Sequence, residues 1–311
     1  MGFKINKNIG FVPDGTPSTA ELADFIELKA ILSDEGRCSI TDVISSLGIG
    51  GDESINNEYI FGGTDEAEIE DSLSEIDNRR IGANEKYPFQ STQFGIILDP
   101  QCNNVIRDVY TFLLLVTRVN MNTLKIQNGI DGTKVFEVLC SAIVENYWGH
   151  SAKSFVIGTG AGTNDFEEKM TNAIKKIGEP NIKFRWPTGS LKKEKDAKVD
   201  VVVYIPFADD KQGRFVALGQ CKTGTNWHSA ISQLVPQAFN QGFFEPTLTF
   251  TPVVLFMVSE AFFYNWETLQ RNSNGLLFDR CRLMQYLPLS LDAQLLNDIK
   301  VWNKGVIENL S

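Results

Sequence analysis

The alternation of apolar and polar positions divides the chain into a mainly helical first part and a second part in which helices and strands alternate. Apolar residues at near-helical spacing predict helices over residues 19–32, 42–49 and 105–121, and the last is apolar on nearly all sides, as a buried helix is. Residues 87–99 indicate a strand or an extended connection. The first two helices have the order of a helix-turn-helix, but acidic residues flank them, so an ordinary packing pair is the favoured interpretation.

The second part begins after residues 122–131, where Asn and Gly collect and a soft boundary is expected. This boundary would divide a mainly helical region of residues 1–122 from a domain of residues 123–311. The elements predicted beyond it are a helix (132–149), a short strand (153–158), a helix (164–179), two strands joined by a turn (199–207 and 214–222), a helix that Pro236 could break (225–242), an apolar strand (251–259) and a C-terminal helix (291–310). Strands that alternate with helices predict an α/β fold.

The distribution of charge keeps nucleic acid among the candidate ligands despite a formal net charge of −10. Residues 52–77 hold ten acids and no Lys or Arg; removing these ten from the 39 acids leaves 29, which balances the 29 bases. That segment is expected to form a loop and one exposed helix, with docking over a basic groove as an autoinhibitory guard as the alternative. Residues 183–198 hold six bases against two acids, a local basic loop that can hold phosphates.

The cysteines and the hydropathy of the chain indicate which metal sites and which cellular compartment to expect. Five cysteines lie far apart without a CxxC pair, and only two histidines are present, so the chain has few ligands for a structural zinc site. This usage fits free thiols in a reducing compartment. No segment has the length and apolarity of a signal peptide or a bilayer span, so we expect a soluble, cytoplasmic protein with no membrane partner.

A carboxylate, an amide and an ammonium group are predicted to meet on the strand pair 199–207 and 214–222. Alternation along a strand puts Gln220 and Lys222 on one face, with Cys221 on the other. A hairpin brings the start of its first strand beside the end of its second, so Asp200 is expected next to Gln220 and Lys222.

This arrangement suits a hard cation such as Mg²⁺ or Mn²⁺, which prefers oxygen ligands and keeps several waters. Asp200 would supply a carboxylate oxygen, and the Gln220 side chain and the Cys221 backbone carbonyl would supply neutral oxygens. Lys222 would orient or help to deprotonate an attacking water and would offset negative charge in the transition state.

These residues resemble a known family. An Asp followed twenty residues later by Gln-x-Lys, on a strand pair between helices, resembles the PD-(D/E)XK restriction-endonuclease superfamily, and the Gln-x-Lys form is similar to Mrr-like restriction enzymes. In that group a Phe-Glu pair on an upstream helix completes the metal site, and this chain has Phe136 and Glu137 in that place. The resemblance covers roughly residues 130–260. The residue before Asp200 is Val199 and not Pro, which many members also lack. Gln220 replaces an acid, which removes one negative charge and makes Glu137 more important.

The resemblance implies a restriction endonuclease-like core, a mixed central sheet flanked by helices, in a nuclease domain of residues 123–311. It implies a metal-dependent endonuclease that hydrolyses phosphodiester bonds of DNA, with RNA not excluded. It further implies the effector of a prokaryotic restriction or anti-phage defence system, working as a homodimer or with a defence-system partner protein.

Contacts to nucleic acid are predicted around this site. Lys192, Lys193 and Lys195 belong to the basic loop and would contact phosphates. His228 is a candidate substrate contact, although a lone His more often caps or packs the start of a helix. Gln233 resembles the polar positions that line active sites in this family, and an exposed helical face explains it equally well.

Two rival functions follow from the same sequence. One is a catalytically silent nucleic-acid-binding module that keeps the fold, because Gln220 replaces an acid. The other is a nucleotide-binding enzyme, since residues 158–165 (GTGAGTND) follow a short strand and hold three glycines. The spacing is not that of G-x-G-x-x-G, so a Gly-rich connection within the nuclease fold is favoured.

Overall fold

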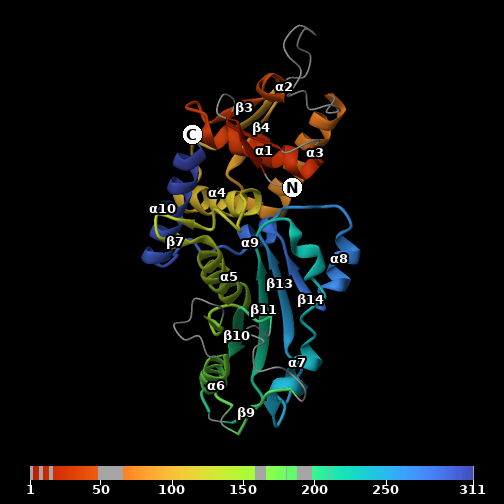
Figure 1. Cartoon of the computed structure of the whole chain (residues 1–311), viewed down its shortest axis with the longest axis vertical. Coiled ribbons are helices and arrows are strands. Elements are labelled where there is room, and N and C mark those ends of the chain that lie inside the picture. Colours follow the sequence, from red (N-terminus) through yellow and green to blue (C-terminus); the bar gives the residue numbers. More distant parts are fainter. Residues whose placement is uncertain are drawn as a thin grey trace.

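The computed structural model of the chain describes residues 3–6, 10–13, 17–47, 66–157, 166–179, 181–187, 198–209 and 211–310. A five-stranded mixed sheet occupies the lower part of the molecule in Figure 1, with mainly helical elements above it. The fold is therefore α/β, as the alternation of predicted strands and helices indicated.

The sheet has the strand order β14-β13-β11-β10-β8. Its strands are β8 (Lys153–Val156), β10 (Val201–Ile205), β11 (Phe215–Lys222), β13 (Val253–Val258) and β14 (Gly275–Phe278). β8, β10 and β11 are antiparallel neighbours, whereas β13 runs parallel to both β11 and β14. The carboxyl ends of β11, β13 and β14 consequently lie at the same edge of the sheet, and ligands commonly bind at that edge in open α/β sheets.

The predicted hairpin of β10 and β11 is confirmed. β-Branched residues favour the strand at residues 201–205, and its register runs from Val201 opposite Gly219 to Ile205 opposite Phe215. Both strands alternate between the two faces of the sheet. Val202 and Leu218 belong to one buried apolar cluster, and Val201 and Val203 belong to another.

Helices cover both faces of the sheet. α5 (Gly132–Trp148) packs against β8 and β10 on one face, where Leu139 and Cys140 enter the larger apolar cluster. α6 (Phe166–Ile177) and α7 (Pro236–Phe243) contribute to the smaller cluster on the other face, together with Val202 and Leu218. A small sheet of β9 (Lys183–Phe184) and β12 (Phe244–Glu245) closes the lower end.

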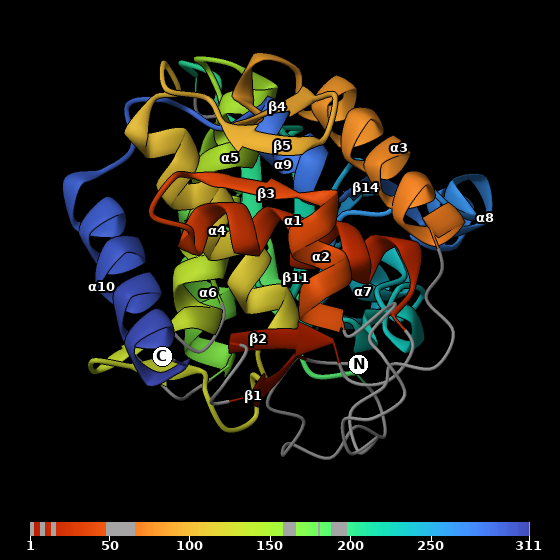
Figure 2. The same ribbon diagram turned by 90° about the horizontal axis from the view of Figure 1, so that it is seen from above.

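The N-terminal region lies over the edge where the parallel strands end. It contains α1 (Thr19–Leu32), α2 (Ile40–Leu47), α3 (Glu66–Ala83), α4 (Asn104–Arg118), a sheet of β3 (Arg37–Ser39), β5 (Gly95–Leu98) and β4 (Phe89–Thr92), a hairpin of β1 (Phe3–Asn6) and β2 (Gly10–Pro13), and the 3₁₀ turn Asn84–Lys86. Seen from above, α10 (Ala293–Leu310) lies along one side of this region and α3 along another (Figure 2). The remaining elements are β6 (Ile126–Gln127), β7 (Ile130–Asp131), α8 (Trp266–Asn272) and α9 (Arg280–Gln285).

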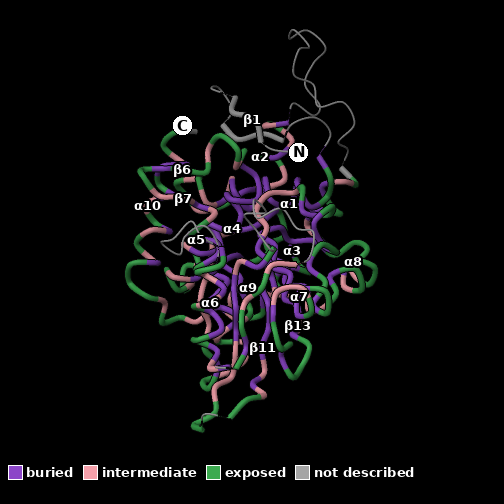
Figure 3. Tube along the Cα trace, turned by 60° about the horizontal axis from the view of Figure 1, so that its bottom comes forward, coloured by how far each residue is buried: buried purple, intermediate pink, exposed green. Residues whose placement is uncertain are grey.

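The buried core continues across the boundary predicted near residues 122–131. One apolar cluster joins α1 and α4 to α5, β11 and α10, and α10 packs directly on α4. Figure 3 shows buried stretches running from α4 into β11. The domain boundary near residue 122 stays a prediction, and residues on both sides of it contribute to this shared core. Within the described part of the chain, none of the helices combines the length and apolarity that a bilayer crossing needs.

Two predicted elements need correction. Residues 225–242 are not one helix: a 3₁₀ turn covers Asn226–Ser229, and α7 begins at Pro236, because proline lacks an N–H and fits the first helical turn. The acidic helix is not merely a solvated face, because Ile69, Ile76 and Arg79 of α3 are buried against neighbouring helices. The rest of the acidic segment, residues 52–65, lies outside the described residues.

Candidate active site

The hairpin brings Asp200 to Gln220. The regular register of β10 and β11 ends at the pair of Val201 and Gly219, and the backbone N–H of Asp200 also donates to the Gly219 carbonyl, at 2.8 Å. The backbone N–H of Cys221 donates to Asp200 Oδ2 at 2.7 Å. This bond holds the half-buried carboxylate at the end of β11 and strengthens its role as a fixed acceptor.

The Gln220 amide is buried without a hydrogen-bond partner. Its side chain is 0% exposed, and within the described part of the chain neither Oε1 nor Nε2 has a partner. A buried amide in this state costs about 1–3 kcal/mol for each unsatisfied group. The cost is unusual in a native core, and it falls one residue before Cys221, whose N–H binds Asp200.

Lys222 ends β11 on the same face. Val216 and Leu218 belong to the smaller apolar cluster, and alternation carries that face on to Gln220 and Lys222. Lys222 is half-buried, so the site reaches solvent at the end of the strand. Asp200 is held at this end of the hairpin by the Cys221 N–H, and the convergence of its carboxylate with the Gln220 and Lys222 side chains stays a prediction.

Glu137 approaches from α5, on the opposite face of β11. Burial raises the pKa of the Cys221 thiol well above its usual value, and contact with Cys140 and the carboxylates of Asp200 and Glu137 raise it further. Both carboxylates are therefore close enough to Cys221 for their charges to act on its thiol. A thiol with this raised pKa is a poor nucleophile.

The predicted nucleic-acid contacts are only partly described. Lys192, Lys193 and Lys195 lie outside the described residues, and so does the Gly-rich segment 158–165. His228 is exposed and stacks on Trp227 with ring centroids 3.9 Å apart, and burial lowers its pKa. Gln233 is exposed in the segment before α7, and its Nε2 donates to the Ser229 carbonyl, so it does not lie on a helix as predicted.

The types of donor suit a hard cation. Asp200 and Glu137 offer carboxylate oxygens, Gln220 offers a buried amide oxygen that has no partner among the described residues, and the backbone carbonyl of Cys221 follows it along β11. Among the described residues, no three His, Cys, Asp or Glu side chains gather into a metal-binding group. The candidate set holds only two carboxylates, and its third side-chain ligand is an amide.

A buried ionic cluster at the same edge of the sheet was not foreseen from the sequence. Asp24 of α1 accepts hydrogen bonds from Arg79 at 2.6 Å, Arg118 at 2.5 Å and Arg280 at 2.7 Å. Burial alone would raise the pKa of Asp24, but the charges of Arg118, Arg280 and Arg79 outweigh it and hold that pKa far below its usual value. Glu27 joins the cluster by accepting from the hydroxyls of Tyr87 and Tyr110.

This ionic cluster touches the strand that carries Lys222. Ser259 follows β13 and donates its N–H to the Lys222 carbonyl at 3.2 Å. Its own carbonyl accepts from Arg280 Nε, and its hydroxyl accepts from Thr117. The cluster therefore fixes the backbone at the end of β11. A sequence signal existed in Arg118, a charged residue directly after the apolar run of α4, but nothing identified its partners.

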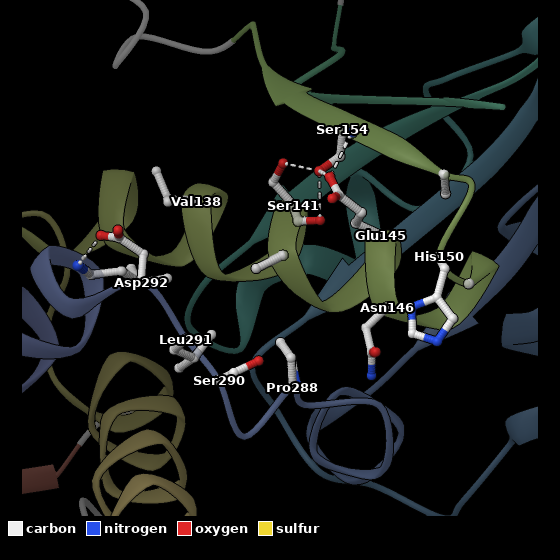
Figure 4. Close-up of a pocket in the computed structure, with 14 residues that line it drawn as sticks. Val138, Ser141, Glu145, Asn146, His150, Ser154, Pro288, Ser290, Leu291 and Asp292 are labelled. Carbon is white, nitrogen blue, oxygen red and sulfur yellow. Dashed lines mark hydrogen bonds between the residues drawn. The ribbon is translucent and has the colours of Figure 1, made fainter. Parts of the chain in front are cut away.

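A separate groove of about 490 Å³ lies between α5, β8 and the segment before α10 (Figure 4). Three of its polar side chains are bound to one another: the backbone N–H and the hydroxyl of Ser154 both donate to Glu145 Oε2, at 2.8 and 2.7 Å, and Ser141 donates to the Ser154 hydroxyl. Because these three groups satisfy one another, they do not indicate a ligand.

Comparison of the chain with protein-family models, with curated proteins and with solved structures finds no match.

Proposed function

We propose that the protein is a metal-dependent nuclease that hydrolyses phosphodiester bonds of DNA, with Asp200, Gln220, Lys222 and Glu137 at its active site. The observation that carries the proposal is the buried Gln220 amide, which has no partner among the described residues and lies between Asp200, held by the Cys221 N–H, and Lys222 in the order of the hairpin. Buried amides are normally satisfied, so an exception flanked by two charged groups at a sheet edge favours a site over ordinary packing.

The finer fold proposal is a restriction endonuclease-like core. Its support is a mixed central sheet with helices on both faces, in which a helix bearing Glu137 precedes the hairpin of Asp200 and Lys222. A role as the effector of a prokaryotic restriction or anti-phage defence system, and action as a homodimer, are proposals that follow from the same resemblance.

Each residue of the proposed site has a separate role. Asp200, Glu137 and the oxygens of Gln220 and Cys221 would hold Mg²⁺ or Mn²⁺. When bound, such an ion lowers the pKa of water and neutralises charge on a phosphate. The Cys221 N–H orients the Asp200 carboxylate. Lys222, a point charge at the half-buried end of β11, orients the attacking water and offsets the negative charge that develops on the phosphate oxygens.

A cleavage assay tests this proposal. Wild-type protein with Mg²⁺ should cut DNA, and EDTA or the change Lys222→Ala should remove the activity. Lys211→Ala is the matched control, because Lys211 is an exposed lysine in the turn of the same hairpin. Its activity should equal that of wild type.

Other outcomes identify the rival functions. DNA binding without cutting under all metal conditions would contradict the nuclease and favour the silent module, which the replacement of an acid by Gln220 supports. Saturable nucleotide binding that Lys222→Ala leaves unchanged, without cutting, would favour the nucleotide-binding enzyme.

A further inference from the structure

A basic groove of about 300 Å³ lies between the edge strand β8 and helix α6. Lys169, Lys175 and Lys176 line it, and none of its lining residues is acidic. Lys175 and Lys176 are exposed, and the ammonium of Lys176 lies 4.7 Å from the centroid of the Phe155 ring, which forms part of the strand wall. A cation–π contact of this kind positions the ammonium without neutralising its charge.

The groove leads to the candidate active site along β8. Phe155 pairs with Val202, and the N–H of Ile157, another lining residue, donates to the Asp200 carbonyl at 2.8 Å. Phe155 lies two residues along a strand and one strand across from Asp200, which is a separation of about 8 Å. Nucleic acid rises about 3.4 Å for each nucleotide, so this separation equals about two to three nucleotides.

We infer that this groove binds the sugar-phosphate backbone of the DNA substrate, about two to three nucleotides from the bond that is cut. The inference rests on the proposed nuclease function for the identity of its ligand. Charge complementarity supports it: the protein carries a net charge of −10, so a polyanion needs a local cluster of bases to approach. A groove with three lysines and no acid among its lining residues supplies such a cluster beside Asp200.

The test measures binding separately from cutting. A fluorescein-labelled DNA oligonucleotide, single-stranded and as a duplex, is titrated with protein in EDTA over a range of NaCl concentrations, and anisotropy gives the affinity. The double change Lys175→Gln and Lys176→Gln should weaken binding at least tenfold. It should also reduce the slope of log K against log salt by about 1.4 to 1.8, since each phosphate contact contributes about 0.7 to 0.9.

A matched control removes two lysines elsewhere. Lys300→Gln with Lys304→Gln makes the same change in charge on α10, where the lysines pair with Asp108 and Glu308 on the surface, and it should leave both affinity and slope unchanged. Thermal unfolding confirms that each variant folds. Because Lys175 and Lys176 are exposed, neither change disturbs the core.

The outcomes separate this inference from the proposed function. Weaker binding by the groove variant supports the groove, whether or not the wild-type protein cuts DNA. Equal binding by wild type and groove variant would overturn the groove even if cutting and its loss in Lys222→Ala support the nuclease. Displacement of the oligonucleotide by an equimolar amount of inorganic phosphate would also overturn it, because the site would then be one for a small anion.

Discussion

Two polar regions lie at the same edge of the sheet, and they differ in whether their buried groups have hydrogen-bond partners. In the ionic cluster, Asp24 is fully buried and surrounded by Arg79, Arg118 and Arg280, all within hydrogen-bond distance. In the candidate active site, Gln220 is equally buried, yet its amide has no partner among the described residues. Complete pairing is typical of groups that hold a structure together, and incomplete pairing is typical of groups that bind something else.

The two regions also depend on each other. Ser259 bonds to the Lys222 carbonyl on one side and to Arg280 and Thr117 on the other, so the ionic cluster holds the strand end on which the candidate site is built. The cluster joins α1, α3, α4 and α9, so the N-terminal region acts as a support for the site. The comparison therefore predicts losses of stability on one side and losses of activity on the other.

The largest effect is expected in the ionic cluster. Asp24→Asn leaves three buried arginines without their shared charge partner and should lower the free energy of unfolding by about 3–5 kcal/mol. Urea unfolding measures this loss. Asp34→Asn, an exposed acid after α1, is the control and should change stability by less than about 0.5 kcal/mol. If Asp24→Asn also changed the free energy of unfolding by less than about 0.5 kcal/mol, the cluster would not be structural.

The next effect is expected in activity. Asp200→Asn removes a charge from the candidate metal site and should lower the cleavage rate roughly 100-fold to 1,000-fold. Stability should fall by only about 1 kcal/mol, since one hydrogen bond from Cys221 is weakened. Asp209→Asn, in the turn of the same hairpin, should cut at the wild-type rate. An activity unchanged in Asp200→Asn would remove this residue from the site.

Gln220 separates the two regions most sharply, because its replacement should stabilise the protein. Gln220→Leu removes an unsatisfied buried amide and should raise the free energy of unfolding by about 1–3 kcal/mol while cleavage is lost. Gln220→Glu restores a carboxylate and should tighten metal binding, measured by calorimetry with Mn²⁺. A loss of stability in Gln220→Leu would mean that the amide has a structural task.

The smallest effect concerns pH. The folded-state pKa of Asp24 lies below its unfolded value of about 3.9, so its contribution is complete above that value and declines as the pH falls below it. The difference in unfolding free energy between wild type and Asp24→Asn should therefore shrink by about 1 kcal/mol at pH 3. A difference that stays constant between pH 6 and pH 3 would contradict the lowered pKa.

Local patterns in the sequence predicted the parts of the fold that local physics determines. Alternation and β-branched residues predicted β10, β11 and β13, and the hairpin geometry predicted that Asp200 lies beside the end of β11, where the Cys221 N–H binds it. Pro236 was read as a break in a helix, although it begins one, because a proline is compatible with both positions.

The ionic cluster could not be predicted in the same way. Asp24 and Arg280 meet across 256 residues, and no periodic pattern links charged groups so far apart. The burial of α3 was missed for the same reason, since Arg79 is a charged residue whose partners lie on another helix. The unsatisfied amide of Gln220 likewise depends on its surroundings and appears only in three dimensions.

The most direct test of the central claim is the anomalous diffraction of a crystal grown with Mn²⁺. The account predicts a single strong peak about 2 Å from a carboxylate oxygen of Asp200 and from Oε1 of Gln220. Crystals that diffract well but show no peak at this place, or manganese bound only elsewhere, would contradict it.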